Sequence, residues 1–380
     1  MATEQNPAYS PGLEGILAGE TAISRVDPTA GLIYRGYDIQ ELAAHASYEE
    51  IVWLLLNGEL PAMSELATLS RHLAEERSVP AVLLELFRLM PPAAHPMDTL
   101  RTGVSMLATL DPDLNDFSPE ANRRKAMRLI AKVSSLITAA WRIAHGQELL
   151  PPNSTLTHAG NFLYQIYGEV PDLWCMEIMD TVLVLYADHG FNASTFSARV
   201  TASTLAPIYA AVTTALGTLE GPLHGGANEE AMKMLKDIGS PERVEDWVKE
   251  RLAHREKIMG FGHRVYERGD ARVPVMRELA RQLGDRFGQE RWVEICEELE
   301  TVMQREKQLY ANLDLYAAPV LYLLGIPSEL NTAVFACARI AGWCAHILEQ
   351  QAHNRLIRPR ALYIGYAPRP YATRFSKSAA

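Results

Sequence analysis

The chain has 380 residues, with 36 Lys and Arg against 46 Asp and Glu, which gives a formal net charge of −10. Hydrophobic residues make up 48% and charged residues 22%, a balance typical of a globular protein and not of a disordered one. Binding to nucleic acid or to an anionic membrane surface needs a positive field, so the acidic total argues against both partners. The length predicts two domains, because one hydrophobic core rarely serves so long a chain.

Membrane and secretion signals are missing from the sequence. No apolar run approaches the roughly 18–20 residues that a membrane-spanning helix needs, and residues 1–15 lack the basic and apolar segments of a secretory signal. The four cysteines (Cys175, Cys296, Cys337 and Cys344) include no C-x-x-C pair, so we expect buried thiols and no disulfide framework. A reducing cytoplasm is the expected location.

The hydrophobic pattern changes once along the chain. Residues 14–38 contain short β-prone stretches interrupted by Asp27-Pro28, which predict a small hairpin. After Ile39 apolar residues recur at intervals of three and four, the period of an amphipathic helix, and prolines punctuate the remaining chain at helix lengths. The sequence therefore predicts an all-α protein with a small N-terminal β-hairpin region.

Two segments, residues 176–187 and 332–347, are apolar on nearly all sides and predict buried helices. The second is rich in Ala and Gly, which lets helices approach closely, so we expect it to cross the core. Arg339 lies within it. A buried guanidinium needs an anion. Either an internal Asp or Glu or a substrate carboxylate satisfies that need.

Three histidines are candidates for chemistry. His189 follows the first buried segment, His224 lies in GPLHGGAN (221–228), and His263 lies in GFGHR (260–264). Glycine admits sharp turns and close approach of a ligand. His224 also precedes a predicted helix, whose positive end favours the neutral imidazole, and such an imidazole can stabilise an enolate by donating a hydrogen bond. A purely structural role remains the alternative for each histidine.

Known cofactor motifs do not fit these residues. The histidines are separated by 35 and 39 residues, which matches no H-E-x-x-H or paired Cys/His spacing, so we expect no metal. GFG lacks the third glycine and the preceding strand of a dinucleotide fingerprint, and neither a phosphate loop nor G-x-S-x-G occurs. Carbonyl chemistry without a metal or cofactor is the interpretation that remains.

Arginines gather in two places. Residues 351–380 contain no acidic residue and carry +6, so residues 1–350 carry −16. A second cluster follows His263 within nine positions. Forked guanidinium groups suit carboxylates and phosphates, so the two clusters predict a polyanionic small molecule as substrate, although a solvated basic tail remains the alternative from Arg369 onward. The basic residues concerned are Arg355, Arg358, Arg360, Arg369, Arg374 and Lys377 in the first cluster and Arg264, Arg268 and Arg272 in the second.

Taken in order, these motifs resemble the citrate synthase family, in its shorter bacterial form, across essentially the whole chain. No single motif would suffice for this resemblance. The matching segments are 12–15 (GLEG), 34–38 (YRGYD), 95–97 (HPM), 188–195 (DHGFNAST), 221–228 (GPLHGGAN), 260–266 (GFGHRVY), 312–314 (NLD), 338–343 (ARIAGW) and 358–359 (RP).

The resemblance implies an acyltransferase of the tricarboxylic acid cycle that acts as a homodimer. It would condense acetyl-CoA with oxaloacetate in a Claisen reaction and hydrolyse the citryl thioester to citrate and CoA. It also implies a large helical domain of residues 1–221 and 325–380, which dimerises and holds part of the oxaloacetate site. Residues 222–324 would form a small helical domain on the CoA side that carries the catalytic Asp.

The same resemblance assigns roles to single residues. Asp314 would remove the acyl α-proton, His224 would stabilise the enolate, and His263 would donate to the oxaloacetate carbonyl. A carboxylate base must be desolvated, so we expect domain closure on oxaloacetate before acyl-CoA binds. For Asp314 alone, a helix cap is the alternative. The implied ligands are His189, Arg272, Arg339 and Arg358 for oxaloacetate or citrate, and Arg264, Arg268 and Arg360 for CoA.

The chain departs from the family pattern at several positions. Tyr186 stands where many citrate-forming relatives carry His, and Asn331 replaces a frequent Phe; Glu267, Ala271 and Ala311 also differ. One methylene in an apolar pocket is worth only about 1–3 kcal/mol. Two alternatives therefore remain: a 2-methylcitrate synthase that uses propionyl-CoA, and a catalytically inactive helical scaffold of the same fold.

Overall fold

The computed structural model describes residues 9–28, 31–262, 266 and 269–371. The described residues fall into two compact units, Met1–Glu20 with Ile357–Ala380 and Thr21–Leu356. The first unit contains one short 3-10 turn, η1 (Pro11–Leu13), and the second contains every strand and α-helix of the described chain. The predicted division into a large and a small domain concerns other boundaries and stays a prediction.

A small antiparallel sheet opens the second unit. Strands β1 (Ser24–Asp27), β2 (Gly31–Tyr34) and β3 (Tyr37–Asp38) pair in the order β1-β2-β3. Leu32 and Tyr34 are buried while their neighbours on β2 are less so, which is the alternation of a strand with one buried face. The predicted hairpin is confirmed, and the structure adds the short third strand.

From Ile39 onward the described chain is helical, so the predicted all-α fold class is confirmed. Polar N-caps fix many helix starts; the side chains of Thr157, Asp172 and Asn192 each accept a backbone N–H three residues further on. The helices of the first half are α1 (Ile39–His45), α2 (Tyr48–Asn57), α3 (Met63–Glu76), α4 (Ala81–Leu89), α5 (Pro96–Leu110), α6 (Pro119–Ala144), α7 (His158–Tyr167) and α8 (Leu173–Tyr186). Those of the second half are α9 (Ala193–Ser203), α10 (Ile208–Leu219), α11 (Ala227–Ile238), α12 (Val244–Ala253), α13 (Val273–Phe287), α14 (Arg291–Lys307), α15 (Leu313–Leu323) and α16 (Asn331–Ala352), with 3-10 turns η2 (Pro241–Arg243) and η3 (Ser328–Leu330).

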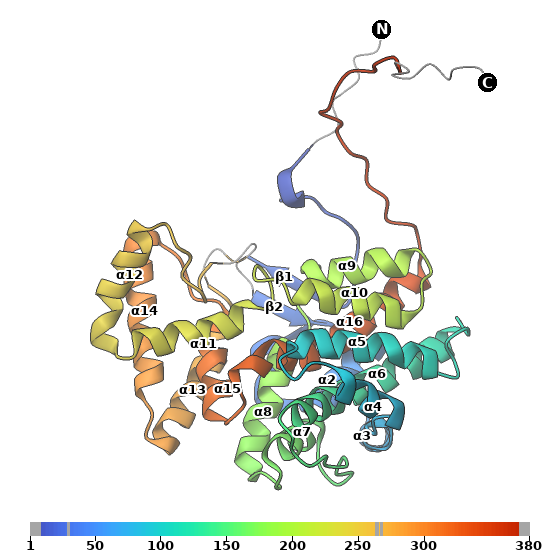
Figure 1. Ribbon diagram of the computed structural model, residues 1–380, viewed down its shortest axis with the longest axis horizontal. Helices are drawn as coiled ribbons and strands as arrows, with labels where there is room; N and C mark the ends of the chain where they lie inside the picture. The colour runs from blue at the N-terminus through green and yellow to red at the C-terminus, as the bar shows by residue number, and fades with distance from the viewer. Residues whose placement is uncertain (1–8, 29–30, 263–265, 267–268, 372–380) are drawn as a thin grey trace, which may run out of the picture. The chain divides into compact units, whose positions relative to one another are not determined.

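Helix α16 crosses the core of the second unit, as its composition predicts. Its residues are buried without a break from Asn331 to Ile347. Small side chains let α2, α6, α8, α9 and α10 pack against it on several sides (Figure 1). None of the helices in the described ranges is long and apolar enough to cross a membrane.

Helices α11 to α15 form a second group, seen on the left of Figure 1. Within it α13 and α11 both pack against α15, and α12 packs against α14. Helix α15 is apolar and almost wholly buried, although its first turn carries Asp314. The start of α15, the start of α11 and the end of α8 all contribute to one polar site.

Candidate active site

Asp314 lies in the first turn of α15, and the turn before the helix fixes its place. The side chain of Asn312 is the N-cap and accepts the Asp314 N–H at 3.1 Å. Asn312 also donates its backbone N–H to Gly260 O (2.9 Å) and its side-chain amide to Gly262 O (3.1 Å). The capping role is therefore filled by Asn312, which leaves the Asp314 carboxyl available for another function.

The surroundings of Asp314 make it an unusually basic carboxylate. Burial raises its pKa to about 6, while a hydrogen bond from Tyr186 and the charges of Arg272 and Arg339 act in the opposite direction. The Tyr186 hydroxyl donates to Asp314 Oδ1 at 2.9 Å. A carboxyl with this pKa is ionised at neutral pH and still accepts protons more readily than an ordinary Asp, as a general base requires.

His224 lies in a tight loop between α10 and α11. Gly225 donates its N–H to Leu219 O at 2.8 Å, and a Cβ at Gly225 would lie 2.8 Å from the same oxygen, so only glycine allows this close approach. The Ser194 backbone N–H donates to His224 Nε2 at 3.3 Å. We therefore place the proton of the neutral ring on Nδ1.

The neutral form of His224 is strongly favoured. Burial, with the positive charge of Arg339, lowers its pKa to about 4. The expectation of a neutral imidazole is supported, although burial is the main cause of the shift and not the helix end. At neutral pH this ring offers one N–H to an oxygen in the site.

Arg339 is almost completely buried, with 1% of its surface exposed. Its Nε donates to Tyr186 O at 2.7 Å, and its guanidinium lies 4.7 Å from the ring centre of Phe335. Its NH1 has no hydrogen-bond partner, and it forms no ion pair with an Asp or Glu, within the described ranges. Of the two sequence alternatives, an unpaired cation awaiting a substrate carboxylate fits this geometry better.

One aromatic ring connects these groups. The Phe335 ring centre lies 4.5 Å from that of Tyr186 and 6.1 Å from that of His224. Arg339 stacks on the same ring. Tyr186, the neutral imidazole and the buried guanidinium therefore surround a single side chain of α16, and the base Asp314 is connected to it through Tyr186.

Arg272, at the N-terminal end of α13, has an internal acid partner. Its Nε and NH2 contact the two oxygens of Asp270 at 2.9 and 2.7 Å, and its NH1 donates to Leu185 O at 3.4 Å. Asp270 Oδ2 also accepts the Leu313 N–H at 3.2 Å, which ties the start of α15 to Arg272. The pair fixes the guanidinium next to Asp314 and raises the pKa of Arg272.

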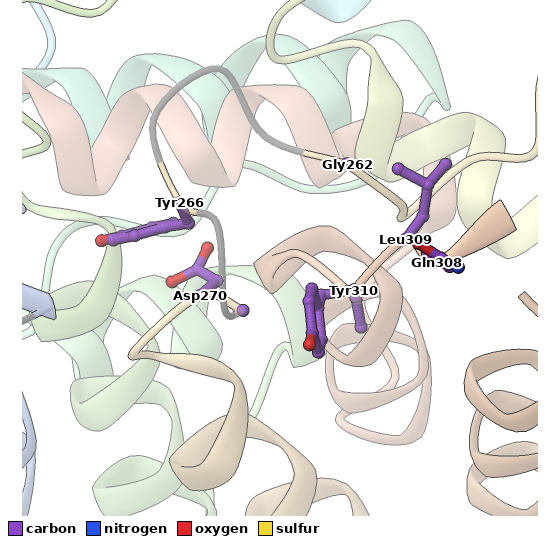
Figure 2. A pocket seen from close by; sticks show the side chains of 8 residues that line it. Gly262, Tyr266, Asp270, Gln308, Leu309 and Tyr310 are labelled. Atoms are coloured by element: carbon purple, nitrogen blue, oxygen red, sulfur yellow. The ribbon is translucent and has the colours of Figure 1, made fainter. Parts of the chain in front are cut away.

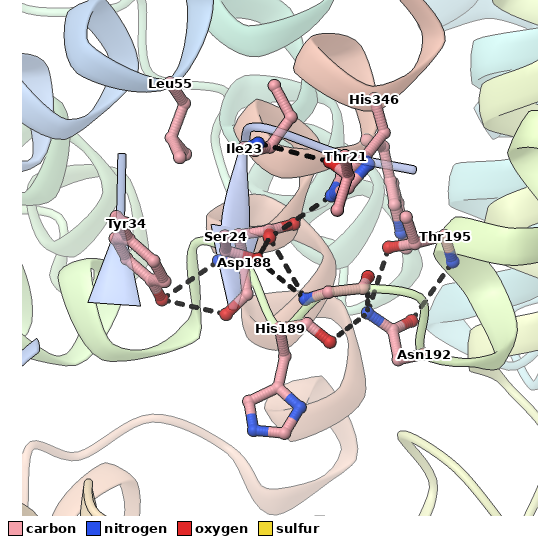
Figure 3. Close-up of polar contacts among 12 residues, drawn as sticks. Thr21, Ile23, Ser24, Tyr34, Leu55, Asp188, His189, Asn192, Thr195 and His346 are labelled. Carbon is pink, nitrogen blue, oxygen red and sulfur yellow. Dashed lines mark hydrogen bonds and ion pairs between the residues drawn. The ribbon is translucent and has the colours of Figure 1, made fainter. Parts of the chain in front are cut away.

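His189 lies in the loop between α8 and α9, where Asp188 anchors the backbone. The Asp188 carboxylate accepts hydrogen bonds from the Ser24 hydroxyl and the Gly190 N–H and contacts His346 Nε2 at 3.3 Å (Figure 3). The His189 ring points away from this cluster and its Nε2 lies 3.0 Å from the Tyr266 hydroxyl. The anchored loop thus places His189 next to Tyr266.

A pocket of about 140 Å³ lies next to the turn that precedes α15 (Figure 2). Tyr266 and Asp270 lie on one side of it, and Tyr310, Leu309 and Gln308 on the other. The pocket adjoins Asp270, which holds Arg272, so it opens beside the polar site. Its lining residues are Gly262, Tyr266, Gly269, Asp270, Gln308, Leu309, Tyr310 and Ala311.

The structure does not bring all of the predicted residues into this site. His263, Arg264 and Arg268, like Glu267, lie outside the described residues. Arg358 and Arg360 belong to the other unit, where both are exposed, and Arg358 NH1 donates to Pro359 O at 3.5 Å. The predicted roles of His263, Arg264, Arg268, Arg358 and Arg360 stay predictions.

Known proteins match the chain along nearly its whole length. The family model described as "Citrate synthase, C-terminal domain" matches residues 12–360. The chain belongs to the citrate synthase family. The resemblance seen in the sequence motifs is therefore confirmed.

Relatives in this family carry two kinds of name. The "citrate/2-methylcitrate synthase" of Bacillus subtilis is 46% identical over 95% of this chain and 98% of its own. The "2-methylcitrate synthase" of Mycobacterium tuberculosis is 43% identical over 96% and 93%. A citrate synthase of Thermoplasma acidophilum, solved as a ternary complex with carboxymethyl coenzyme A and oxaloacetate, shares the fold with a TM-score of 0.92 at 31% identity, over 97% of this chain and 99% of its own.

Several residues of the site were not singled out as site residues in the sequence. Asp270 stands two positions before Arg272, and an Asp-x-Arg pair is a detectable signal for a fixed guanidinium. Asn228 is the last residue of the GPLHGGAN motif, and no separate role is predicted for it from the sequence. Tyr186 was visible only as a departure from the citrate synthase pattern, and its contact with Asp314, 128 residues away, depends on the tertiary fold.

Proposed function

We propose that this protein is a citrate synthase, an acyltransferase that condenses acetyl-CoA with oxaloacetate and releases citrate and CoA. Relatives named citrate synthase support this function. The observation that carries it is the arrangement around Phe335. The neutral imidazole of His224 and the unpaired buried guanidinium of Arg339 lie against its ring. The basic carboxyl of Asp314 accepts a hydrogen bond from Tyr186, which packs on the same ring.

Oxaloacetate binds first in this proposal. Its carboxylates suit the unpartnered NH1 of Arg339 and the positive charge of Arg272, which Asp270 holds in place, with His189 as a further ligand and Arg358 as a ligand from outside this unit. The anion would also remove the cost of leaving Arg339 buried without a partner. Binding would therefore draw the surrounding helices together before acyl-CoA arrives.

Proton abstraction follows. Asp314 takes a proton from the α-carbon of the acetyl thioester, and the Nδ1–H of His224 donates to the thioester oxygen as it gains negative charge. The enolate carbon then bonds to the keto carbon of oxaloacetate while His263 donates to the keto oxygen. Water cleaves the resulting citryl thioester to citrate and CoA.

A thiol-release assay tests this function. The purified protein is expected to release CoA from acetyl-CoA only when oxaloacetate is present, and Asp314→Ala is expected to lower the rate by roughly 10²–10⁴-fold. Asp285→Ala, at an exposed position on α13, serves as the matched control. A folded protein that releases no CoA with acetyl-CoA or propionyl-CoA would favour the inactive scaffold instead.

A 2-methylcitrate synthase is the second candidate. Tyr186 favours it, because its ring packs against Phe335 beside the base and replaces the His of many citrate-forming relatives. A relative named for both products supports the comparison. The ratio of kcat/KM for acetyl-CoA and propionyl-CoA decides between the candidates, and a preference for propionyl-CoA would overturn the first.

We infer that the protein is a homodimer in the cytoplasm and acts in the tricarboxylic acid cycle without a metal or cofactor. A small domain of residues 222–324 closes on the rest of the chain in this proposal. Arg264, Arg268 and Arg360 are the proposed CoA ligands. Light scattering of the purified protein is expected to give twice the chain mass of 42.2 kDa.

A further inference from the structure

Three buried side chains from three helices form a chain of hydrogen bonds that ends at the proposed base, Asp314. Asn331 at the start of α16 donates its Nδ2 to Asn228 Oδ1 at 3.3 Å, and Asn228 on α11 donates its Nδ2 to the Tyr186 hydroxyl at 2.8 Å. Tyr186 at the end of α8 donates to Asp314 Oδ1 at 2.9 Å. At most 1% of the surface of each of the three is exposed, so water does not compete for these bonds.

The donor and acceptor atoms of these side chains give the series of hydrogen bonds a direction. An amide nitrogen only donates, so the Tyr186 oxygen must accept from Asn228. The single phenol proton is then left for Asp314 Oδ1, which accepts it as a carboxylate. The bond from Asn331 agrees with this orientation of the Asn228 amide, because Asn331 Nδ2 faces the Asn228 oxygen.

Asn228 lies between Tyr186 and Asn331 in this network and bonds to both. Asn331 Oδ1 is buried without a partner in the described structure, which costs stability. The bond from its Nδ2 to Asn228 offsets part of that cost.

We propose that Tyr186, oriented by Asn228 and Asn331, is a positioning residue for Asp314, whose Oδ1 it holds so that Oδ2 faces the acyl α-carbon. This inference rests on the proposed function. The phenol also keeps Asp314 ionised at lower pH than burial alone would allow, since its hydrogen bond opposes the rise in the Asp314 pKa. The other charged groups that act on Asp314 are Arg272 and Arg339, which lower its pKa, and Asp270, which raises it.

The pH dependence of kcat tests the proposal in the full-length protein. Tyr186→Phe removes the donor and keeps the ring against Phe335, so the acid limb of the profile is expected to move up by about one pH unit. At pH 6 kcat then falls roughly fivefold, because the ionised fraction of Asp314 drops by that factor, while the KM for oxaloacetate changes little. Loss of a merely structural contact would lower activity evenly across pH.

Asn228→Asp tests the direction of the network at constant side-chain size. A carboxylate at this position accepts the phenol proton and turns it away from Asp314, so the acid limb is again expected to move up. Asn331→Leu, which frees the Asn228 amide, is expected to give a smaller shift in the same direction. Should Tyr186→Phe fail to fold, these two variants carry the test.

Tyr316→Phe is the matched control. Tyr316 is also a buried tyrosine that donates to a carboxylate, Glu300 Oε2 at 2.6 Å, and it lies on the same helix as Asp314. Its profile is expected to match that of the unmodified protein. Profiles of Tyr186→Phe and Asn228→Asp that coincide with the control would overturn the inference alone, whereas an unmodified protein that releases no CoA would overturn the proposed function with it.

Discussion

The raised pKa of Asp314 makes this carboxyl a source of instability at neutral pH. Its folded-state pKa of about 6 exceeds the ordinary value of 3.8. The folded state therefore binds the proton more tightly than the unfolded state, so stability falls as pH rises from about 4 to about 6 and stays low above that.

Asp314→Asn is expected to raise the free energy of unfolding at pH 8 by up to about 3 kcal/mol, since it removes a buried charge and keeps an acceptor for Tyr186. At pH 4 the gain is expected to vanish, because the native carboxyl is then neutral. Denaturant unfolding at pH 4, 6 and 8 measures this. An equal gain at all three pH values would contradict the ionised, buried carboxylate.

Oxaloacetate is expected to stabilise the protein through the buried guanidinium of Arg339. If its free NH1 binds a carboxylate, oxaloacetate at 100 times its Kd stabilises the unmodified protein by about 3 kcal/mol, and Arg339→Met abolishes that gain. Arg277→Met, at a partly exposed arginine paired with Glu300, is the control and is expected to keep it. Thermal unfolding with and without oxaloacetate decides, and a gain retained in Arg339→Met would assign the carboxylate elsewhere.

For single residues, the sequence indicated the chemical type but not the residues that contact them in the fold. Arg339 was recognisable as a buried cation, yet the sequence left open whether an internal acid satisfied it. Asp314 and Tyr186 stand 128 positions apart, and no local pattern brings them within 2.9 Å. Contacts of this kind arise only when α8, α11, α15 and α16 pack, so single-residue chemistry was predictable and its pairing was not.

At the scale of elements, α8 and α16 lie where the apolar pattern predicts them, and polar residues explain the differences at their ends. Asp172 accepts the Cys175 N–H and starts α8 at Leu173, before the apolar run begins. Helix α16 continues to Ala352 through residues too polar to show as core. The sequence also missed strand β3, whose two residues are too short to form a pattern.

Helix α16 approaches the loop that contains Asp188 closely at Gly342. Gly342 donates its N–H to Ala187 O at 3.2 Å, and a Cβ at Gly342 would overlap both that oxygen and Asp188 Oδ1. Gly342→Ala must therefore separate two buried segments, and it is expected to lower the free energy of unfolding by about 2–4 kcal/mol.

Gly217→Ala is the matched control for that substitution. Gly217 lies inside α10, where a Cβ would meet Arg101 Cδ at an ordinary 3.7 Å. Alanine there reduces the freedom of the unfolded chain and is expected to stabilise by up to about 1 kcal/mol. Denaturant unfolding compares the two, and effects of the same sign would refute the close-approach argument.

For the whole molecule, the sequence predicted the fold class and family but not how the proposed domains contact each other. His95 before α5 lies 3.3 Å from Glu229 on α11, and this contact raises the pKa of His95. The Gln40 amide donates to Ala271 O at 3.0 Å, between α1 and the start of α13. Contacts of this kind, together with the bonds of Tyr186 to Asp314 and of His189 to Tyr266, have to rearrange if residues 222–324 move as a body.

Domain closure is therefore expected to depend on oxaloacetate and on Arg339. An anion that pairs with the buried guanidinium gains most when the surrounding helices exclude water, so binding energy favours the closed form. Small-angle X-ray scattering is expected to show a smaller radius of gyration with oxaloacetate and no change with acetyl-CoA alone. Arg339→Met is expected to stay at the unliganded value, because it has no charge to pair. A smaller radius of gyration with acetyl-CoA alone would contradict the proposed binding order, because acetyl-CoA would then cause closure without oxaloacetate.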